Sequence, residues 1–579
     1  MRIDVSHAKG RTVAVFTVIA VFNAALLWHF HDRYWYPVDE GIYATMAERL
    51  LDGEVLHVHI QDFHPGYGDF LNAAAFRLFG VELVSLRYPL VAGAFLQSLF
   101  VFGVFRRESL PIASAAAIAS VALGVVQFLN PTPHWYALYG TCALLYWLTW
   151  APRDGWMRLV GAGAIVGTIG LFHQLLGVLV GTAVLVVALQ EQSRNAEGVD
   201  RRLAQFLMLA PLMGLAAYVV RAPMIEFSGV LLFASWPMAL LLRALLQTRT
   251  ANRDAARVVL FIASGALVST IPLLLYCAIN GSWRETLHET VFAALSFGVR
   301  TAEAQPWYSM LSLGALYQAA TFSTPGDVVN GLFWAILPVV AGINGLFTVL
   351  SREKWNGHGA ALPTVAAFYA LSSLFMQNAI YLFFTAGLSL AGVLWWLSPR
   401  GPAARVAGCV SALALSAIAV AFHAAQPSTR SNIEMLRGTD VLSGEWMKPL
   451  ERVSLRLDRV EQFPYATVVD VINTSVPAGA PIFALPNAPE IYFLTGRQNP
   501  FNFFNTSIGI QSDAALAAVL ERLRAEPPAI VTFRPQDQYN NWASRAIMEH
   551  VRRHYDRIAN AGGVEIYRIT GSEVAVAER

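Results

Sequence analysis

Long apolar runs recur along the chain, and short polar segments separate them. A helix that spans a bilayer needs about 20 mostly apolar residues. Measured with that length, the pattern predicts thirteen spans, which begin near residues 12, 88, 110, 134, 159, 175, 203, 229, 257, 327, 360, 379 and 405. The run from 159 to 190 is interrupted at His173 and Gln174, so it holds either two short helices or one bent helix. The pattern thus predicts a polytopic α-helical membrane protein.

The pattern changes after residue 425, where the chain becomes more polar. Short runs typical of strands alternate in this tail with segments that have apolar residues at helical spacing. The expected strands are 480–486, 529–535 and 564–570, and the expected helices are 513–526 and 542–555. Such alternation predicts a small α/β domain. We therefore expect a transmembrane part at 1–425, which includes a loop with amphipathic helices at 31–88, and an α/β domain at 426–579.

The composition agrees with a membrane protein. Hydrophobic residues make up 55% of the chain and charged residues 14%, which is too apolar for an ordinary soluble enzyme. The net charge of +2 gives no reason to expect nucleic acid as a partner. The three cysteines each lie inside an apolar run, so they indicate neither a disulfide framework nor a clustered metal site. The first run, roughly 12–30, lacks a small-residue cleavage site and is expected to remain as a helix.

Lys and Arg are unevenly distributed among the loops. With thirteen spans and the N-terminus inside the cell, the cytosolic segments carry about 18 of these residues and the opposite loops about 7. Such an excess is the signature of cytosolic loops. The loop at 31–88, a long loop near 280–325 and the tail after residue 423 are then expected outside the cytosol.

Two adjacent carboxylates, Asp39 and Glu40, lie in the first of these outer loops. They follow three aromatic residues at 34–36, a residue type that favours the headgroup level of a bilayer. Asp39 is suited to capping a helix that runs from about Glu40 to Leu51. It is equally suited to acting as a base where the polar head of a lipid meets water. The two roles are compatible, because a capping carboxylate is held in a fixed direction.

Histidines follow in the same loop. In an extended segment, His57 and His59 would point to the same side and, with Asp62 or His64, would present ligands that zinc accepts. His64 precedes Pro65, which keeps it out of the helical region and fixes a turn. That turn either presents the imidazole of His64 toward the membrane surface or only leads into the next helix.

Further candidate contacts lie on the same predicted side of the membrane. Polar groups at the depth of His173 and Gln174 are costly and tend to be functional. Tyr67 is placed to donate to a phosphate oxygen, and His134 lies in an outer hairpin at 130–140 that an aromatic belt also explains. Tyr43, one turn after Asp39, is a further candidate.

Cations are sparse on this side. They include Arg77, Arg87, Arg221, Arg284 and Arg300. One or two of them are suited to clamping a phosphate, although anchoring at the interface is the other common use of such residues. We select Arg300 as the candidate phosphate contact.

The segments DEGIYATMAERLLDGEVL and DFHPGYGDFLNAAAFRLFG in the first outer loop resemble the type C glycosyltransferases. The nearer look-alikes are the protein O-mannosyltransferase-like family and the lipid A aminoarabinose transferases. Asp39, Glu40, His64 and Pro65 match the family's acidic pair and its basic residue before proline. His173-Gln174 matches a Lys-Gln element, with histidine in place of lysine, and 476–500 resembles the tail domain of bacterial members.

This resemblance implies a fold and a reaction. Members are polytopic enzymes that take a sugar from a polyprenyl phosphate and transfer it to an acceptor outside the cytosol. It implies a protein of the cell inner membrane, with the active site and the tail domain in the periplasm. The expected partners are the polyprenyl-phosphate sugar donor, membrane lipid and a lipid, glycan or protein acceptor. No cofactor and no metal are expected.

The resemblance also assigns roles to residues. Asp39 would be the base that deprotonates the acceptor, and Glu40 would orient the acceptor or a neighbouring helix. His64, Tyr67 and Tyr43, with His173, Gln174, His134 and Arg300, would bind substrate. The main alternative is a transporter or flippase of lipid-linked sugars. Transporters bury charges within helices and show paired half-repeats, whereas here acids and histidines gather in outer loops.

Overall fold

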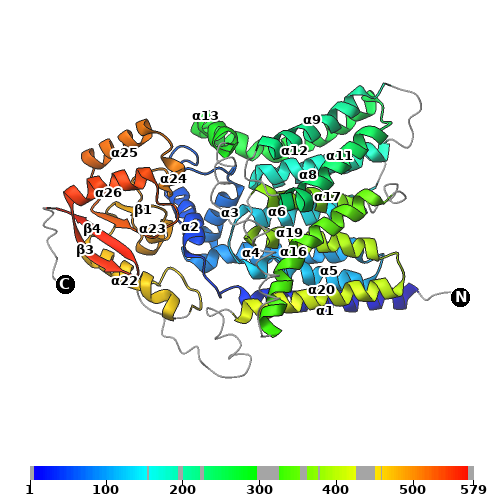
Figure 1. Cartoon of the computed structure of the whole chain (residues 1–579), viewed down its shortest axis with the longest axis horizontal. Helices are drawn as coiled ribbons and strands as arrows, with labels where there is room; N and C mark the ends of the chain where they lie inside the picture. Colours follow the sequence, from blue (N-terminus) through cyan, green and yellow to red (C-terminus); the bar gives the residue numbers. More distant parts are fainter. Residues whose placement is uncertain are drawn as a thin grey trace.

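Helices supply most of the structure, and the long ones lie side by side (Figure 1). The computed structural model describes residues 5–152, 155–192, 200–221, 227–295, 325–351, 361–375, 379–425, 450–457 and 459–570. The helices up to residue 425 are α1 (Val5–Phe30), α2 (Pro37–Leu51), α3 (Tyr67–Phe79), α4 (Leu83–Phe105), α5 (Leu110–Ala122), η1 (Val125–Gln127), α6 (Pro133–Trp150), α7 (Trp156–Phe172), α8 (Gln174–Gln192), α9 (Arg202–Arg221), α10 (Phe227–Gly229), η3 (Val230–Ala234), α11 (Ser235–Gln247), α12 (Asn252–Asn280), α13 (Trp283–Leu287), η4 (His288–Ala293), α16 (Pro325–Leu350), α17 (Ala361–Ala370), α18 (Ser372–Phe375), α19 (Ala379–Leu397) and α20 (Pro402–Ala425).

Ten helices in the described part of the chain are long and apolar enough to cross a membrane. Two shorter apolar helices, over 156–172 and 361–374, accompany them. Each of the thirteen predicted starts lies in a described helix or one residue before it. The chain is therefore a multi-pass membrane protein, and the predicted polytopic helical fold is confirmed.

The doubtful run at 159–190 forms two helices. α7 ends at Phe172 and α8 begins at Gln174, with His173 between them in an extended conformation. A Cβ atom on Gly177 would lie 2.4 Å from the Cα of Gly170, so the two backbones touch near the turn. Only glycine allows so close an approach, and the hairpin turn presents His173 at one end of the bundle.

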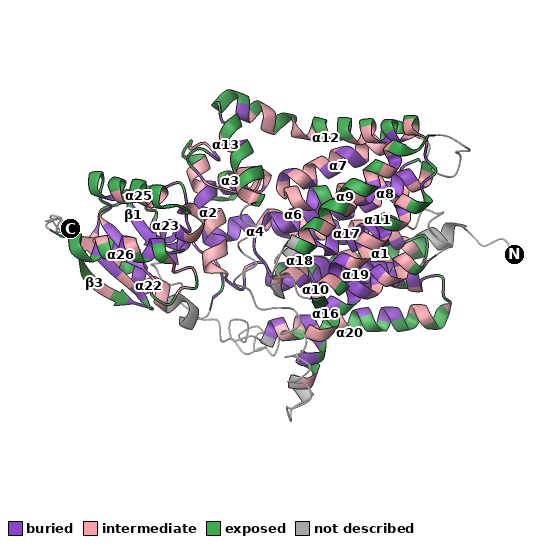
Figure 2. Cartoon of the chain, turned by 45° about the horizontal axis from the view of Figure 1, so that its top comes forward, coloured by how far each residue is buried: buried purple, intermediate pink, exposed green. Residues whose placement is uncertain are grey.

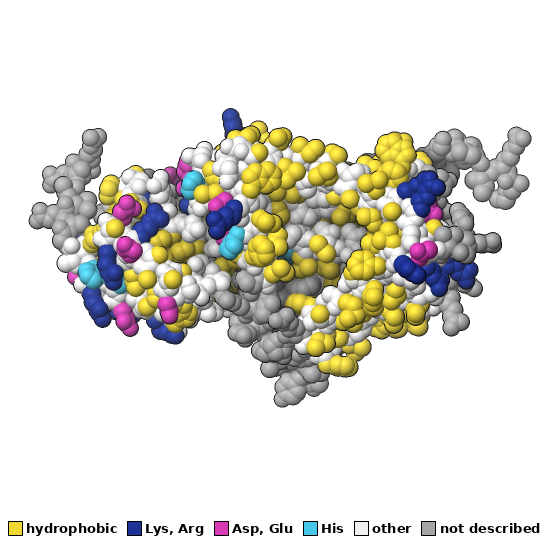
Figure 3. Space-filling model, turned by 90° about the horizontal axis from the view of Figure 1, so that it is seen from above, with side chains coloured by type: hydrophobic (Ala, Val, Ile, Leu, Met, Phe, Trp, Pro, Cys, Tyr) yellow, Lys and Arg dark blue, Asp and Glu magenta, His cyan; other side chains and the backbone are white. Residues whose placement is uncertain are grey.

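Burial separates inner helices from outer ones (Figure 2). In the segment 110–127, which contains α5, 78% of the most apolar window is buried, against 11% for α9 and for α12. Seen from above, hydrophobic side chains cover a broad band of the surface, and cations gather near its right-hand end (Figure 3). Outward apolar side chains on α9 and α12 fit contact with lipid, because lipid tails solvate them as well as a protein core does.

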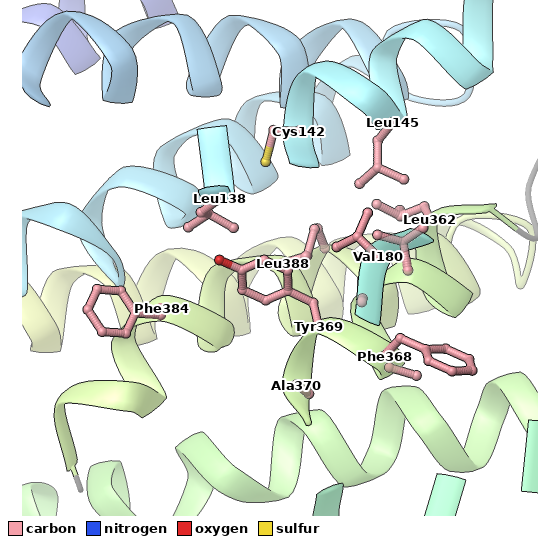
Figure 4. Close-up of a cluster of buried hydrophobic side chains, with 14 of the residues drawn as sticks. Leu138, Cys142, Leu145, Val180, Leu362, Phe368, Tyr369, Ala370, Phe384 and Leu388 are labelled. Carbon is pink, nitrogen blue, oxygen red and sulfur yellow. The ribbon is translucent and has the colours of Figure 1, made fainter. Parts of the chain in front are cut away.

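The centre of the bundle supports the start of α6. Leu138, Cys142 and Leu145 of α6 face α8, α17 and α19 in a dry cluster (Figure 4). The Tyr369 hydroxyl of α17 donates to the carbonyl oxygen of His134 at 3.3 Å. The Phe384 ring stacks on the imidazole of His134 with centroids 4.7 Å apart. His134 is thus held by the core beneath it.

The tail forms an α/β domain, as predicted. Its sheet has four strands, and helices surround it. Its elements are α22 (Arg459–Ser475), β1 (Ile482–Leu485), α23 (Pro489–Thr495), α24 (Thr506–Gly509), α25 (Asp513–Ala525), β2 (Ile530–Phe533), α26 (Trp542–His554), β3 (Tyr555–Ala561) and β4 (Val564–Ile569). The strand order is β1-β2-β4-β3, with β1 and β2 parallel and the other pairs antiparallel. The sequence analysis missed β3, whose hairpin turn with β4 is made by Gly562 and Gly563, both with positive φ.

Helices α2 and α3 lie between the bundle and the tail domain, at the end opposite the N-terminus (Figure 1). α2 packs on α23: a Cβ on Gly41 would lie 2.4 Å from the Cα of Glu490. The Thr45 hydroxyl donates to the carbonyl oxygen of Pro489 at 3.1 Å. The predicted boundary after residue 425 adjoins 426–449, which lie outside the described residues.

Candidate active site

Asp39 lies in the first turn of α2. Pro37 begins this helix, so Asp39 is its third residue. The expected role of Asp39 as N-cap is wrong, because Tyr36 holds that position and no side chain caps the helix. Asp39 is partly buried, and the described residues give it neither a hydrogen bond nor an ion pair. Burial, then the charges of Glu40 and Glu490, raise the pKa of Asp39 to about 6.

Glu40 points away from Asp39 into the protein. Its carboxylate is fully buried and pairs with Arg87 through two hydrogen bonds of 2.8 and 2.9 Å. The backbone N–H of Tyr36 donates to the same carboxylate at 3.0 Å. Because both oxygens are occupied, Glu40 fits the predicted role of orienting a helix, and Arg87 is not free to bind phosphate.

The segment 55–60 is a tight turn, so the expected extended pairing of His57 and His59 is wrong. His57 has a φ of 67°, and its ring contacts Thr286 Oγ1 at 3.2 Å and the carbonyl oxygen of His64 at 2.9 Å. The ring of His59 accepts a hydrogen bond from the backbone N–H of Val55. Both histidines therefore brace the turn that precedes His64.

His64 forms an ion pair with Asp62, with 2.9 Å between Nδ1 and Oδ1. Burial lowers the pKa of His64, but the charge and hydrogen bond of Asp62 outweigh it, so the pKa is raised. Asp69 of α3 is fully buried beside Asp62, and burial together with that negative charge raises the pKa of Asp69 well above its usual range. Burial and the charge of Asp62 thus favour the neutral form of Asp69, whereas Asp62 favours the protonated form of His64.

Two more histidines adjoin this pair. The Nε2 atoms of His134 and His173 are 3.0 Å apart, and the ring of His64 lies 5.2 Å from that of His173. Gln174 donates to the carbonyl oxygens of Phe63 and Thr290, at 2.6 and 3.1 Å. The structure thus brings His64, His134 and His173 together, and Gln174 ties the loop before His64 to α8.

The remaining predicted substrate contacts are Tyr67, Tyr43 and Arg300. Tyr67 donates to the carbonyl oxygen of Ser269 at 2.9 Å, so its hydroxyl anchors α3 to α12. Tyr43 of α2 lies within range of the charges of Asp39, Asp62 and Asp69. Arg300 lies outside the described residues.

Sequence reasoning missed the contribution of the tail domain. Glu490 is 1% exposed and pairs with Arg534 at 2.5 Å. The charge of Glu490 acts on Asp39, and the charge of Asp39 acts on Tyr539. These residues lie more than 400 positions from Asp39 along the chain, and no local pattern links them to it.

The chain is similar to two solved structures. One is the crystal structure of ArnT from Cupriavidus metallidurans bound to undecaprenyl phosphate, at 13% identity over 98% of this chain and 99% of that one, with a TM-score of 0.39. The other is the same protein in the apo state, at 13% identity over 97% and 98%, with a TM-score of 0.38. No protein-family model and no curated protein matches the chain. At these TM-scores the likeness carries no argument.

Asp39 and His64 together offer a base and a hydrogen-bond donor for an anion. No described residue pairs with Asp39, and its pKa of about 6 leaves it mostly ionised at neutral pH, yet basic enough to take a proton. Among the described residues, no hydrogen-bond partner lies at Nε2 of His64, and its side chain is 24% exposed. In its protonated form the ring can donate a hydrogen bond to an anion there. In the described part of the chain, no three His, Cys, Asp or Glu side chains are arranged to hold a metal ion.

Proposed function

We propose that the protein is an inverting glycosyltransferase of the cell inner membrane. It moves a sugar from a polyprenyl-phosphate-linked donor to a cell-envelope acceptor on the periplasmic side. In this reaction the acceptor hydroxyl attacks the anomeric carbon while its proton passes to Asp39. The bond between that carbon and the phosphate oxygen breaks, and polyprenyl phosphate leaves. One displacement with no covalent enzyme intermediate inverts the anomeric configuration.

The proposal is carried by Asp39. It is a carboxylate beside the membrane-spanning bundle that has no hydrogen-bond or ion-pair partner among the described residues, and burial, Glu40 and Glu490 raise its pKa to about 6. A structural carboxylate in such a place would be paired, because leaving a charge partly desolvated costs free energy. A base near neutral pH needs this setting.

The donor side of the proposal rests on the histidines. The leaving group gains negative charge as the sugar departs, so a cationic donor beside it lowers the barrier. Protonated His64 would supply that hydrogen bond through Nε2, with Asp62 holding the ring from the other side. Arg300 remains a predicted second contact with the phosphate.

The proposal is tested by mass analysis of envelope glycolipids and glycans from cells with and without the protein. We expect one species to lose the mass of one sugar when the protein is absent, while the polyprenyl-phosphate sugar accumulates. This result would name both donor and acceptor. Unchanged glycans would overturn the proposal, and an accumulation of donor on the cytosolic face alone would argue for the transporter alternative.

We expect the transfer rate to show a bell-shaped dependence on pH. It rises as pH passes through about 6, where Asp39 loses its proton, and falls as pH passes through the raised pKa of His64 and that ring loses its charge. In His64→Lys the alkaline limb should move to higher pH, because lysine stays charged to about pH 10. The rate is measured from pH 5 to pH 10 in reconstituted bilayers. An alkaline limb that stays in place would remove His64 from the phosphate site.

A further inference from the structure

The loop at 534–541 of the tail domain is fixed against α2. Arg534 begins this loop and pairs with Glu490, whose Cα is the atom that abuts Gly41. Gly41 is two residues from Asp39. Since α23 and α2 are in direct contact, the Glu490–Arg534 ion pair ties the start of the loop to the helix that bears the base.

The loop is rigid by its own hydrogen bonds. The Asn540 amide donates to the carbonyl oxygens of Arg534 and Pro535, at 2.9 and 2.8 Å. The Asp537 carboxylate accepts from the backbone N–H of Tyr539 at 2.8 Å. These bonds link the two ends of the loop to each other, and Gln536 and Gln538 are exposed. A preorganised loop of this kind loses little entropy when it binds a ligand.

Tyr539 is half-buried and adjoins Asn540, whose bonds to Arg534 and Pro535 hold this end of the loop against its start. The pKa of Tyr539 is raised by burial and then by the charges of Asp39 and Asp537. Tyr381 of α19 also lies within reach of the charges of Asp39 and Tyr539, and its ring contacts that of His134 at 5.1 Å. Side chains of three elements distant in sequence, α2, α19 and the loop 534–541, are therefore close enough to interact electrostatically.

The residue types of this loop suit a sugar. An aromatic ring packs on the apolar face of a pyranose while its hydroxyl makes a hydrogen bond. Side-chain amides both donate and accept, as neighbouring hydroxyls do. The loop offers Tyr539 with Gln536 and Gln538, and no basic side chain other than the paired Arg534.

We propose that the acceptor is a glycan or the sugar headgroup of a glycolipid, and that Tyr539 binds it beside Asp39 as a specificity-determining residue. The inference rests on the proposed function. The tail domain then supplies the acceptor-binding wall of the active site, while His64 holds the donor phosphate.

The test compares Tyr539→Ala and Tyr539→Phe with wild-type full-length protein in nanodiscs. The acceptor is the glycan and glycolipid fraction of cells that lack the protein, and undecaprenyl phosphate is the probe for donor-side binding. Tyr567→Phe is the matched control, because it removes a phenol hydroxyl from β4 of the same domain, where its partner is Glu565.

We expect Tyr539→Ala to raise the acceptor concentration for half-maximal transfer about tenfold, and Tyr539→Phe to raise it by about threefold. The maximal rate should change less, and binding of undecaprenyl phosphate should not change. Half-saturation equal to wild type, or an equal loss of undecaprenyl phosphate binding, would overturn the inference while leaving the glycosyltransferase intact. No transfer by the wild-type protein would overturn the proposed function, and this inference with it.

Discussion

Replacing Asp39 with asparagine is expected to lower the rate of sugar transfer about 10³-fold, within the range of losses seen when a general base is removed. Asparagine keeps the shape of the side chain but cannot accept the proton of the acceptor hydroxyl. The fold should survive, because Asp39 makes neither a hydrogen bond nor an ion pair with a described residue. Thermal unfolding should begin at the wild-type temperature or slightly above it, since the substitution removes a partly desolvated charge.

The matched control is Asp52→Asn, which removes a carboxylate from the exposed C-terminal end of the same helix. It should transfer sugar at the wild-type rate. Asp39→Glu should retain part of the activity, because it keeps the base but moves it by one methylene. If Asp39→Asn transfers sugar as fast as wild type, Asp39 is not the base. If it loses binding of undecaprenyl phosphate as well, its role is structural.

Removing Arg87 is expected to destabilise the fold more than a substitution of Asp39 or His64 does. Arg87→Ala leaves Glu40 buried without its partner, which costs about 3–5 kcal/mol. It also removes the donors to the carbonyl oxygens of His31, Arg33 and Tyr34. Tyr34 has a φ of 75°, unusual for a side chain of its size, so the turn before α2 depends on this guanidinium.

The measurement is the midpoint of thermal unfolding in detergent, with Arg77→Ala as control. Arg77 lies exposed on α3, and its loss should leave the midpoint unchanged. Replacing both Glu40 and Arg87 with leucine should recover part of the stability, since no charge then remains buried. A midpoint for Arg87→Ala within the error of wild type would show that Glu40 is neutral or solvated.

Features that depend on local pattern were predictable from the sequence. A run of about 20 apolar residues is both the signal and the cause of a span, so every predicted start lies at a helix. The break at His173 was visible for the same reason, although only the contact of Gly170 with Gly177 distinguishes two helices from a bent one. The alternating runs of the tail likewise gave three of its four strands.

Features that depend on distant partners were not predictable. The sequence left Glu40 to orient either the acceptor or a neighbouring helix, and the partner that occupies its carboxylate, Arg87, lies 47 residues later. His57 and His59 were expected to be extended, but contacts with Thr286 and with the backbone of Val55 fold that segment into a turn. The signals that were present and overlooked were the Gly562-Gly563 pair before β4 and Asp69 in the first turn of α3.

Because Gly41 contacts Glu490, α2 and the tail domain have to be exchanged together when this protein is re-engineered. A side chain of any size at position 41 would collide with the backbone of α23, so the two surfaces have to be complementary as a pair. Grafting the tail domain of another protein onto this bundle would therefore change the position of Asp39, unless α2 were transferred together with the domain. A chimaera designed to alter acceptor choice should carry both segments, with its junctions outside 37–51 and after α20.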